Sequence, residues 1–175
     1  RRLEAEALHD SLLALPGRLD ARAGGPADSD PSSPRRLIYL AVSRSGRSDF
    51  GTLFDRADAA LHVERRTAST AAPQALLLMN DARVMDLALA LADRPEVAAE
   101  DDPGRRVARL YRLVLGRPAS EDEIALGRDF VAAAMRESPP TGEKTAATEK
   151  GAAGLPPWAQ YAQALLLSNE FLFVD

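Results

Sequence analysis

The chain has 175 residues, of which 46% are hydrophobic and 27% are charged, a composition typical of a globular protein with a substantial core. Its formal net charge of −4 argues against a nucleic-acid-binding surface, and the lack of cysteine excludes disulfides, thiolate catalysis and cysteine-ligated metals within these residues. The two histidines are too few for most histidine-based metal sites, and no apolar run approaches the roughly 20 residues of a transmembrane helix.

The first 34 residues are predicted to form one helix followed by a surface loop. The helix would span residues 1–15 and stop at Pro16. Its apolar face would consist of Leu3, Ala7, Leu8 and Leu12. His9 lies close to that face, so a histidine that packs between helices is favoured over a catalytic one. Residues 18–34 are rich in Gly, Pro, Ser and Asp, and the Gly-Gly-Pro at 24–26 is typical of a tight turn.

One extended segment is expected after this loop. Residues 37–42 (LIYLAV) are short, apolar and rich in β-branched side chains, which predicts a strand or an extended buried segment. Residues 43–49 are predicted to form a polar loop. Residues 49–58 are predicted to be irregular, with three apolar anchors, Phe50, Leu53 and Phe54.

The longest apolar run lies within residues 65–94, and we expect the rest of the chain to pack around it. Ser69 or Thr70 would cap a helix here, and Pro73 fits its first turn. The residues that step along one face of this helix are Leu78, Ala82, Met85, Leu89 and Ala92. Leu77, Val84, Ala88 and Leu91 widen this face, which predicts a helix buried in the core.

Asn80 and Asp81 interrupt that run, and two interpretations are open. They mark either a helix break, with a polar edge between two shorter helices, or a buried polar pair held by Arg65 or Arg66. The second interpretation follows because buried charge is rarely tolerated without a partner.

The clearest signals predict a helical hairpin near the C-terminus. Asp102 and Pro103 begin a helix that Gly116 ends in a left-handed conformation. The buried face of this helix would be Val107, Leu110, Tyr111, Val114 and Leu115. Ser120 and Glu123 then form a capping box that starts the second helix. That helix would face the first through Ile124, Gly127, Val131 and Ala134.

The remaining residues are predicted to form an insert and a last helix. Residues 138–155 are full of Pro, Gly, Thr and charge, which indicates a flexible insert. Pro156-Pro157 starts the last helix, whose buried face would be Trp158, Tyr161, Ala162 and Leu165. The apolar tail at residues 171–174 is expected to be held in the core. The fold class is therefore mainly α, with about five helices packed around a central apolar helix and one short extended segment.

Several segments, in their order, resemble a known family. They are residues 2–8 (RLEAEAL), 24–26 (GGP), 35–39 (RRLIY), 54–55 (FD), 65–66 (RR), 69–70 (ST), 72–76 (APQAL), 80–81 (ND), 110–112 (LYR), 115–118 (LGRP), 164–166 (ALL) and 168–172 (SNEFL). Together they resemble the C-terminal domain of unknown function of large secreted planctomycete proteins. In those proteins it follows a second uncharacterised domain and often a cytochrome-c-like one.

The resemblance implies a periplasmic or extracellular location and a longer parent protein. Residues 1–175 would form a single helical domain, the C-terminal half of a larger family domain. Its partners would be the upstream domains of the same polypeptide, and polysaccharide or envelope proteins are further candidates. No nucleic acid and no membrane span are expected. No cofactor is expected in this chain, because a haem motif is lacking and any haem would belong to an upstream domain.

The family has no activity to transfer, so the candidate site rests on physical chemistry. Five polar residues cluster near the start of the central helix, where N–H groups and the helix dipole favour an anion: Arg65, Arg66, Gln74, Asn80 and Asp81. They either bind a carboxylate, sulfate or sugar, or fasten residues 50–66 to the central helix.

Two classes of function follow. The first is a non-catalytic structural or interaction module of a secreted, envelope-associated multidomain protein. The second is part of a hydrolase or of a carbohydrate-active or carbohydrate-binding domain that the upstream half completes. Against the second, the sequence has no nucleophile–base pair, and acid groups such as Asp55 with Asp58 are better explained as turn residues than as a glycosidase pair.

Overall fold

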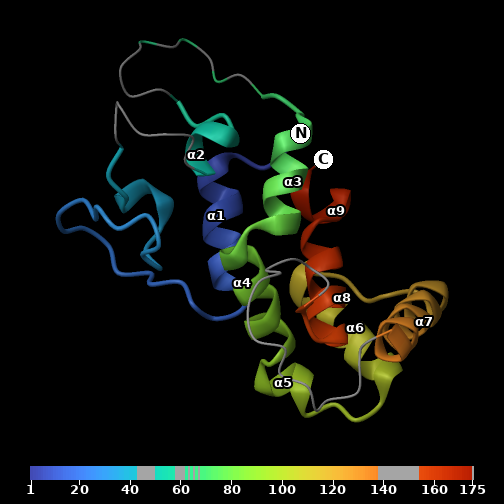
Figure 1. Ribbon diagram of the computed structural model, residues 1–175. Coiled ribbons are helices and arrows are strands. Elements are labelled where there is room, and N and C mark those ends of the chain that lie inside the picture. Colours follow the sequence, from blue (N-terminus) through green and yellow to red (C-terminus); the bar gives the residue numbers. More distant parts are fainter. Residues whose placement is uncertain are drawn as a thin grey trace.

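The structure is a computed structural model that describes residues 1–42, 50–57, 62, 64, 66, 68–137 and 154–174. These residues form a mainly helical fold, as predicted (Figure 1). The helices are α1 (Ala5–Ala14), α2 (Phe50–Leu53), α3 (Ala72–Asn80), α4 (Ala82–Ala92), α5 (Pro95–Ala98), α6 (Pro103–Val114), α7 (Glu121–Glu137), α8 (Pro157–Leu166) and α9 (Asn169–Leu172), with a 3-10 helix, η1, at Leu37–Tyr39. Extended residues in the described ranges pair only as isolated bridges.

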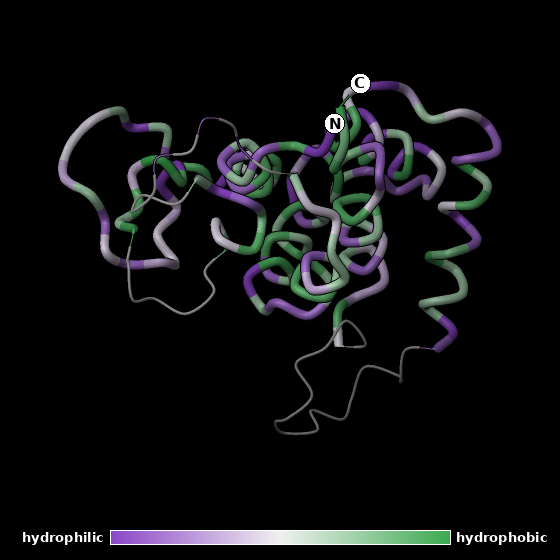
Figure 2. Tube along the Cα trace, turned by 90° about the horizontal axis from the view of Figure 1, so that it is seen from above, coloured by the Kyte–Doolittle hydropathy of each residue, from purple (hydrophilic) through white to green (hydrophobic). Residues whose placement is uncertain are grey.

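Helix α4 lies between two groups of elements. It packs against α8 on one side, and α8 in turn contacts α6 and α7; on the other side α4 contacts α1. Both α4 and α8 bury alanines completely, at Ala88 and Ala162, and such small side chains permit close helix approach. α1 and the loop after it lie on one side of the molecule, and α7 is the outermost helix on the other (Figures 1 and 2).

The central apolar run forms two helices and not one. Asp81 breaks it, because its side-chain oxygen accepts hydrogen bonds from the amides of Arg83 (2.9 Å) and Val84 (3.3 Å) and so caps α4. Asn80 is exposed, so the helix-break interpretation is confirmed and the buried polar pair is wrong. One face of α4 is buried as expected, with Met85, Ala88 and Leu91, but Ala82 is exposed and Leu89 is half-buried. α3 exposes much of its surface, including Leu76.

The predicted start of α3 is also wrong. Its N-cap is Ala71, whose amide donates to the Gln74 side chain at 3.2 Å, and Ser69 lies ahead of the helix. The Ser69 hydroxyl instead donates to Asp55 at 2.9 Å. The Ser69 hydroxyl, which was predicted to cap α3, is therefore used in a tertiary hydrogen bond to Asp55.

The helical hairpin of α6 and α7 is confirmed in detail. The Asp102 side chain accepts from the Arg105 amide at 2.8 Å, and Gly116 has a φ of 70°. Ser120 and Glu123 exchange the two hydrogen bonds of a capping box, at 2.8 and 3.3 Å. Of the residues expected to face α6, Gly127, Val131 and Ala134 are buried and Ile124 is half-buried.

The N-terminal region departs from prediction at two short segments. Residues 37–39 form η1 and not a strand, and Ile38 is 55% exposed. The side chain of Asp10 explains this turn, because its Oδ1 accepts from the Leu37 amide at 2.9 Å and so holds the backbone at the start of η1. Residues 50–53 form α2 where an irregular segment was expected, although Phe54, one of the predicted anchors, is buried.

Other predictions have mixed outcomes. The face of α1 includes Leu8 and Leu12 as predicted, but Ala5 is buried in place of Ala7, and His9 packs in the helix interface as expected. α8 starts at Pro157 as predicted. The predicted loop at residues 43–49 and most of the predicted insert, residues 138–153, lie outside the described residues.

The first and last described residues lie together (Figure 1). Arg2 and Phe173 form an antiparallel bridge, in which Leu3 N donates to Leu172 O and Val174 N donates to Arg1 O, both at 2.8 Å. Phe171 is buried in the core, as expected for the apolar tail, while Val174 is 45% exposed.

Candidate functional site

The structure does not gather the five sequence-predicted polar residues into one pocket. Arg65 lies outside the described residues. Arg66 is exposed and bonds to both carboxylate oxygens of Glu6, at 2.8 and 3.1 Å. Asn80 donates to the Leu76 carbonyl at the end of its own helix, at 2.9 Å. Asp81 caps α4. Gln74 is buried in the first turn of α3, at the other end of that helix from Asn80.

Gln74 makes the connection that the structural interpretation predicts. Its Nε2 donates to the Leu53 carbonyl at 2.9 Å and to the Ser69 hydroxyl at 3.2 Å, and its Oε1 accepts from the Ala71 amide. Only 5% of the residue is exposed. This side chain therefore joins the end of α2 to the start of α3 and satisfies backbone groups that would otherwise lack partners.

Asp55 is the acceptor at the centre of the same region. Its carboxylate accepts from Arg2 Nη2 and from the Ser69 amide, both at 2.7 Å, and from the Ser69 hydroxyl. Burial alone would raise the pKa of Asp55, but these hydrogen bonds and the charge of Arg2 hold it below its ordinary value. Asp55 also has a φ of 60°, a left-handed conformation that Asp tolerates better than most residues.

Asp55, Ser69 and Gln74 thus form one polar network, which we call the Asp55 network. Sequence reasoning named Gln74 as a site residue but treated Asp55 as a turn residue and Ser69 as a cap. The sequence signal for this network was that residues 54–55, 69–70 and 72–76 all belong to the segments that resemble the family.

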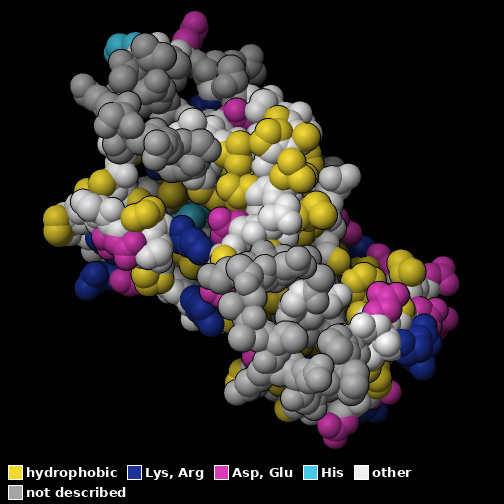
Figure 3. All heavy atoms as spheres, in the orientation of Figure 1, with side chains coloured by type: hydrophobic (Ala, Val, Ile, Leu, Met, Phe, Trp, Pro, Cys, Tyr) yellow, Lys and Arg dark blue, Asp and Glu magenta, His cyan; other side chains and the backbone are white. Residues whose placement is uncertain are grey.

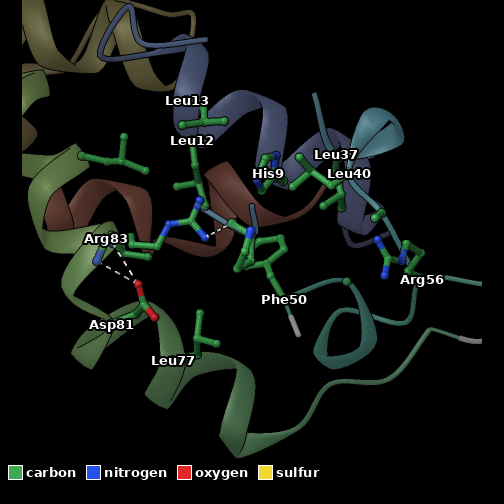
Figure 4. Close-up of a pocket in the computed structure, with 15 residues that line it drawn as sticks. His9, Leu12, Leu13, Leu37, Leu40, Phe50, Arg56, Leu77, Asp81 and Arg83 are labelled. Carbon is green, nitrogen blue, oxygen red and sulfur yellow. Dashed lines mark hydrogen bonds between the residues drawn. The ribbon is translucent and has the colours of Figure 1, made fainter. Parts of the chain in front are cut away.

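A separate cavity opens between α1 and the junction of α3 with α4 (Figure 4). Its volume is about 250 Å³, and its wall is mostly aliphatic and aromatic. The apolar side chains of the wall are Leu12, Leu13, Leu37, Leu40, Phe50, Leu77, Val84 and Leu87. Helices α1, α2, α3, α4 and η1 all contribute, so the cavity is a product of the tertiary fold.

Four ionisable side chains line this cavity. Arg83 extends from α4 across it and donates from Nη1 to the Pro31 carbonyl at 2.6 Å (Figure 4). Arg56 lies on the other side, beside Gly51, and Asp81 lies at the start of α4. His9 is only 6% exposed and stacks edge-on against Phe50, with 5.6 Å between the ring centroids.

The charge state of His9 follows from its surroundings. Burial lowers the pKa of His9, and the positive charges of Arg83 and Arg56 lower it further, although Asp10, at 3.4 Å from Nδ1, acts in the opposite direction. His9 is therefore neutral near pH 7. The positive charge at the cavity comes from the two arginines, which sequence reasoning did not single out.

Two further observations bear on what the described residues can do. They include no group of three or more His, Asp or Glu side chains placed to hold a metal ion. None of their helices combines the length and hydrophobicity needed to cross a bilayer.

Fold and site together define a mainly α protein with a polar network that joins distant backbone segments and a separate cavity whose wall is mostly apolar. The chain belongs to the family described as PSD1, protein of unknown function (DUF1553), whose model matches residues 1–131. The matched residues include the Asp55 network and the whole cavity wall and end within α7. No curated protein and no solved structure matches the chain.

Proposed function

We propose that this domain is a non-catalytic structural or interaction module of a secreted, envelope-associated multidomain protein. Membership of a family of unknown function is consistent with such a module. The periplasmic or extracellular location, the planctomycete origin and the association with cytochrome-c-like domains are proposals that rest on the resemblance described above. Any haem would be carried by an upstream domain.

The observation that carries this proposal is the use made of the polar side chains. Gln74, Asn80 and Asp81 each bond to backbone groups, at Leu53, Leu76 and Arg83 respectively. Asp55 is engaged with Arg2 and Ser69. Side chains committed in this way fix the positions of segments, which is the role expected of a scaffold and not of a catalytic group that must change partners during a reaction.

The outer face of α3 is the surface that we assign to the interaction. Leu76 is 56% exposed and Met79 is 46% exposed, and hydrophobic side chains gather over α3 on this face of the molecule (Figure 3). Arg2 Nη1 donates to the Ser69 carbonyl at 2.7 Å, so the start of the chain is attached just ahead of α3. Upstream residues of a longer parent would leave the domain beside this face. Its occupant is therefore proposed to be the upstream part of the same polypeptide.

The test uses the full-length parent protein with a protease site inserted ahead of Arg1. After cleavage, the two parts should stay together in size-exclusion chromatography. The double variant Leu76→Glu and Met79→Glu should separate them, because it places two charges in an apolar interface.

Leu126→Glu is the matched control, since Leu126 is also exposed but lies on α7. It should leave the cleaved parts associated. Separation of the unmodified parts, or separation by Leu126→Glu to the same degree, would remove the support for an interaction module at α3.

A further inference from the structure

We propose that the cavity between α1 and α4 binds a small uncharged phenol, with the ring of the ligand against the apolar wall and its hydroxyl donating to Nε2 of His9. The proposal concerns a different part of the molecule from the α3 face and does not depend on the function proposed above.

The size and wall of the cavity set the apolar part of the ligand. A cavity of about 150 Å³ lined by Leu, Ile and Phe holds benzene. The present cavity is larger, about 250 Å³, and leucines of α1, η1, α3 and α4 line it together with Phe50. It therefore has room for a benzene ring that carries a small substituent. A charged ligand is disfavoured, because it is costly to bury a charge among apolar side chains.

His9 contributes a hydrogen-bond acceptor to this wall. The carboxylate of Asp10 decides which ring nitrogen carries the proton, since it already accepts from Arg36 and from the Leu37 amide. The imidazole atom that faces this acceptor is Nδ1, at 3.4 Å from Asp10 Oδ1. Nδ1 therefore carries the proton of the neutral ring, and Nε2 keeps a lone pair that can accept a hydrogen bond.

The Nε2 atom of His9 has no partner. No residue that the structure describes bonds to it, although only 6% of His9 is exposed. This nitrogen is not wholly enclosed, unlike the unpartnered Nε atoms of Arg2, Arg35 and Arg106. Since the ring lines the cavity, a ligand there can reach it (Figure 4). A buried acceptor without a partner costs free energy, and a hydroxyl donor from the ligand removes that cost.

The imidazole is held in place before any ligand binds. Asp10 contacts it at Nδ1, and Phe50 packs edge-on against it with 5.6 Å between the ring centroids. Asp10 is itself fixed by its hydrogen bonds to Arg36 and to the backbone of η1. Little side-chain freedom is therefore lost when a hydroxyl bonds to His9, which favours binding.

The probe for this site is p-cresol, and toluene is the reference ligand, because the two molecules differ only by the hydroxyl. Their affinities would be measured by NMR titration of the whole chain. Both ligands should shift the amide signals of wall residues such as Leu12, Leu77 and Val84. p-Cresol should bind about fivefold more tightly than toluene, the effect of one hydrogen bond between neutral groups.

Two substitutions of His9 test its role as the acceptor. His9→Leu removes the acceptor and should make toluene the tighter ligand, because the hydroxyl of p-cresol would be buried without a partner. His9→Gln extends about as far as Nε2 and carries an amide oxygen, so it should restore the preference for p-cresol. Binding of toluene to both variants would show that the cavity is still formed.

His62→Leu is the matched control, since His62 is the other histidine of the chain and is exposed. It should leave both affinities unchanged. The proposal is overturned if p-cresol at about 5 mM shifts no wall amide, or if it binds no more tightly than toluene. Loss of the preference in His62→Leu, or its persistence in His9→Leu, would also overturn it. The comparison of the two ligands needs no variant, so it remains decisive if His9→Leu does not fold.

Discussion

The two sides of the molecule are held together by different kinds of contact. In the region of α6 to α9, helices pack mainly through apolar side chains, and Asp102, Ser120 and Ser168 cap the starts of α6, α7 and α9. Among residues 18–42 and 50–57, single polar side chains bond to backbone groups that are well separated in the sequence. Arg35, for example, is 5% exposed and donates to the carbonyls of both Gly24 and Pro26.

This difference follows from the needs of the backbone. A helix pairs its internal N–H and C=O groups without help, whereas loop backbone groups bond partly to side chains such as Arg35 and Gln74, although most of residues 18–36 are exposed. The helical region should therefore be sensitive to changes of side-chain volume, and the loop region to the loss of one charge or amide. Four substitutions probe this comparison.

The largest effect is expected from Gly127→Val in α7. A Cβ at Gly127 would lie 2.5 Å from Tyr161 Oη and 2.8 Å from Val107 Cγ2, so valine would force α7 away from α6 and α8. We expect a loss of about 3 kcal/mol in the free energy of unfolding, measured by urea denaturation. Ala132→Val, at an exposed position of the same helix, should cost well under 1 kcal/mol. Equal effects of the two variants would show that volume is not what limits this region.

Asp55→Asn tests the charge at the centre of the Asp55 network. Asn keeps the tolerance for a positive φ but removes the negative charge that faces the buried Arg2 guanidinium. We expect a loss of about 2 kcal/mol near pH 7, with faster hydrogen exchange at the Ser69 amide. An unfolding free energy within 0.5 kcal/mol of the parent, about the scatter of neutral surface changes, would contradict the role given to this carboxylate.

The pH dependence of stability offers an intermediate effect. Hydrogen bonds from Arg117 and the Ser120 amide lower the pKa of Glu123 from 4.5 to about 2. A carboxylate whose pKa is lower in the folded state stabilises the fold above its unfolded pKa, and this contribution disappears as the pH falls toward 2. Glu123→Gln should therefore lower the melting temperature at pH 6 and have little effect near pH 2.

Glu121→Gln makes the same change of charge on the same helical turn and serves as the control. Glu121 lacks the bidentate contact that Glu123 makes with Arg117, at 2.7 and 2.8 Å. Its replacement by Gln should therefore shift the melting temperature much less at pH 6. A pH profile that is the same for both variants would contradict the assignment.

The smallest effect is expected from Arg66→Ala. Arg66 was a candidate site residue, but its side chain is 40% exposed, its partner Glu4 is 50% exposed and its partner Glu6 is only half-buried. Exposed ion pairs contribute little, so the free energy of unfolding should fall by about 0.5 kcal/mol, and by less in high salt. A loss as large as that of Asp55→Asn would show that Arg66 belongs to the Asp55 network.

The same contrast explains how far the sequence could predict the fold. Asp102, Gly116, Ser120 and Glu123 act on neighbouring residues, so their sequence pattern alone was sufficient for the hairpin. Asp55 bonds to Arg2, which lies 53 positions earlier in the sequence, and no periodic pattern of residues predicts such a contact. The 3-10 helix at Leu37–Tyr39 likewise depends on Asp10, which belongs to another element.

The candidate site divides along the same line. Gln74 could be found because it belongs to a recognisable helix start, and in the structure its side chain bonds to Leu53, Ser69 and Ala71. The cavity could not be found, because its wall comes from five elements whose contacts appear only after folding. Arg56 and Arg83 have no sequence pattern that distinguishes them from the other arginines.

The pairing of the two ends of the chain has a mechanical consequence. Arg2 and Phe173 are neighbours in the fold, so tension applied between the two ends would act first on the backbone hydrogen bonds beside them, at 2.8 Å each. Those bonds would open one after another, as a zipper does, before any helix interface carried load. A module anchored in this way would yield at its ends under stretching while its interior stayed intact.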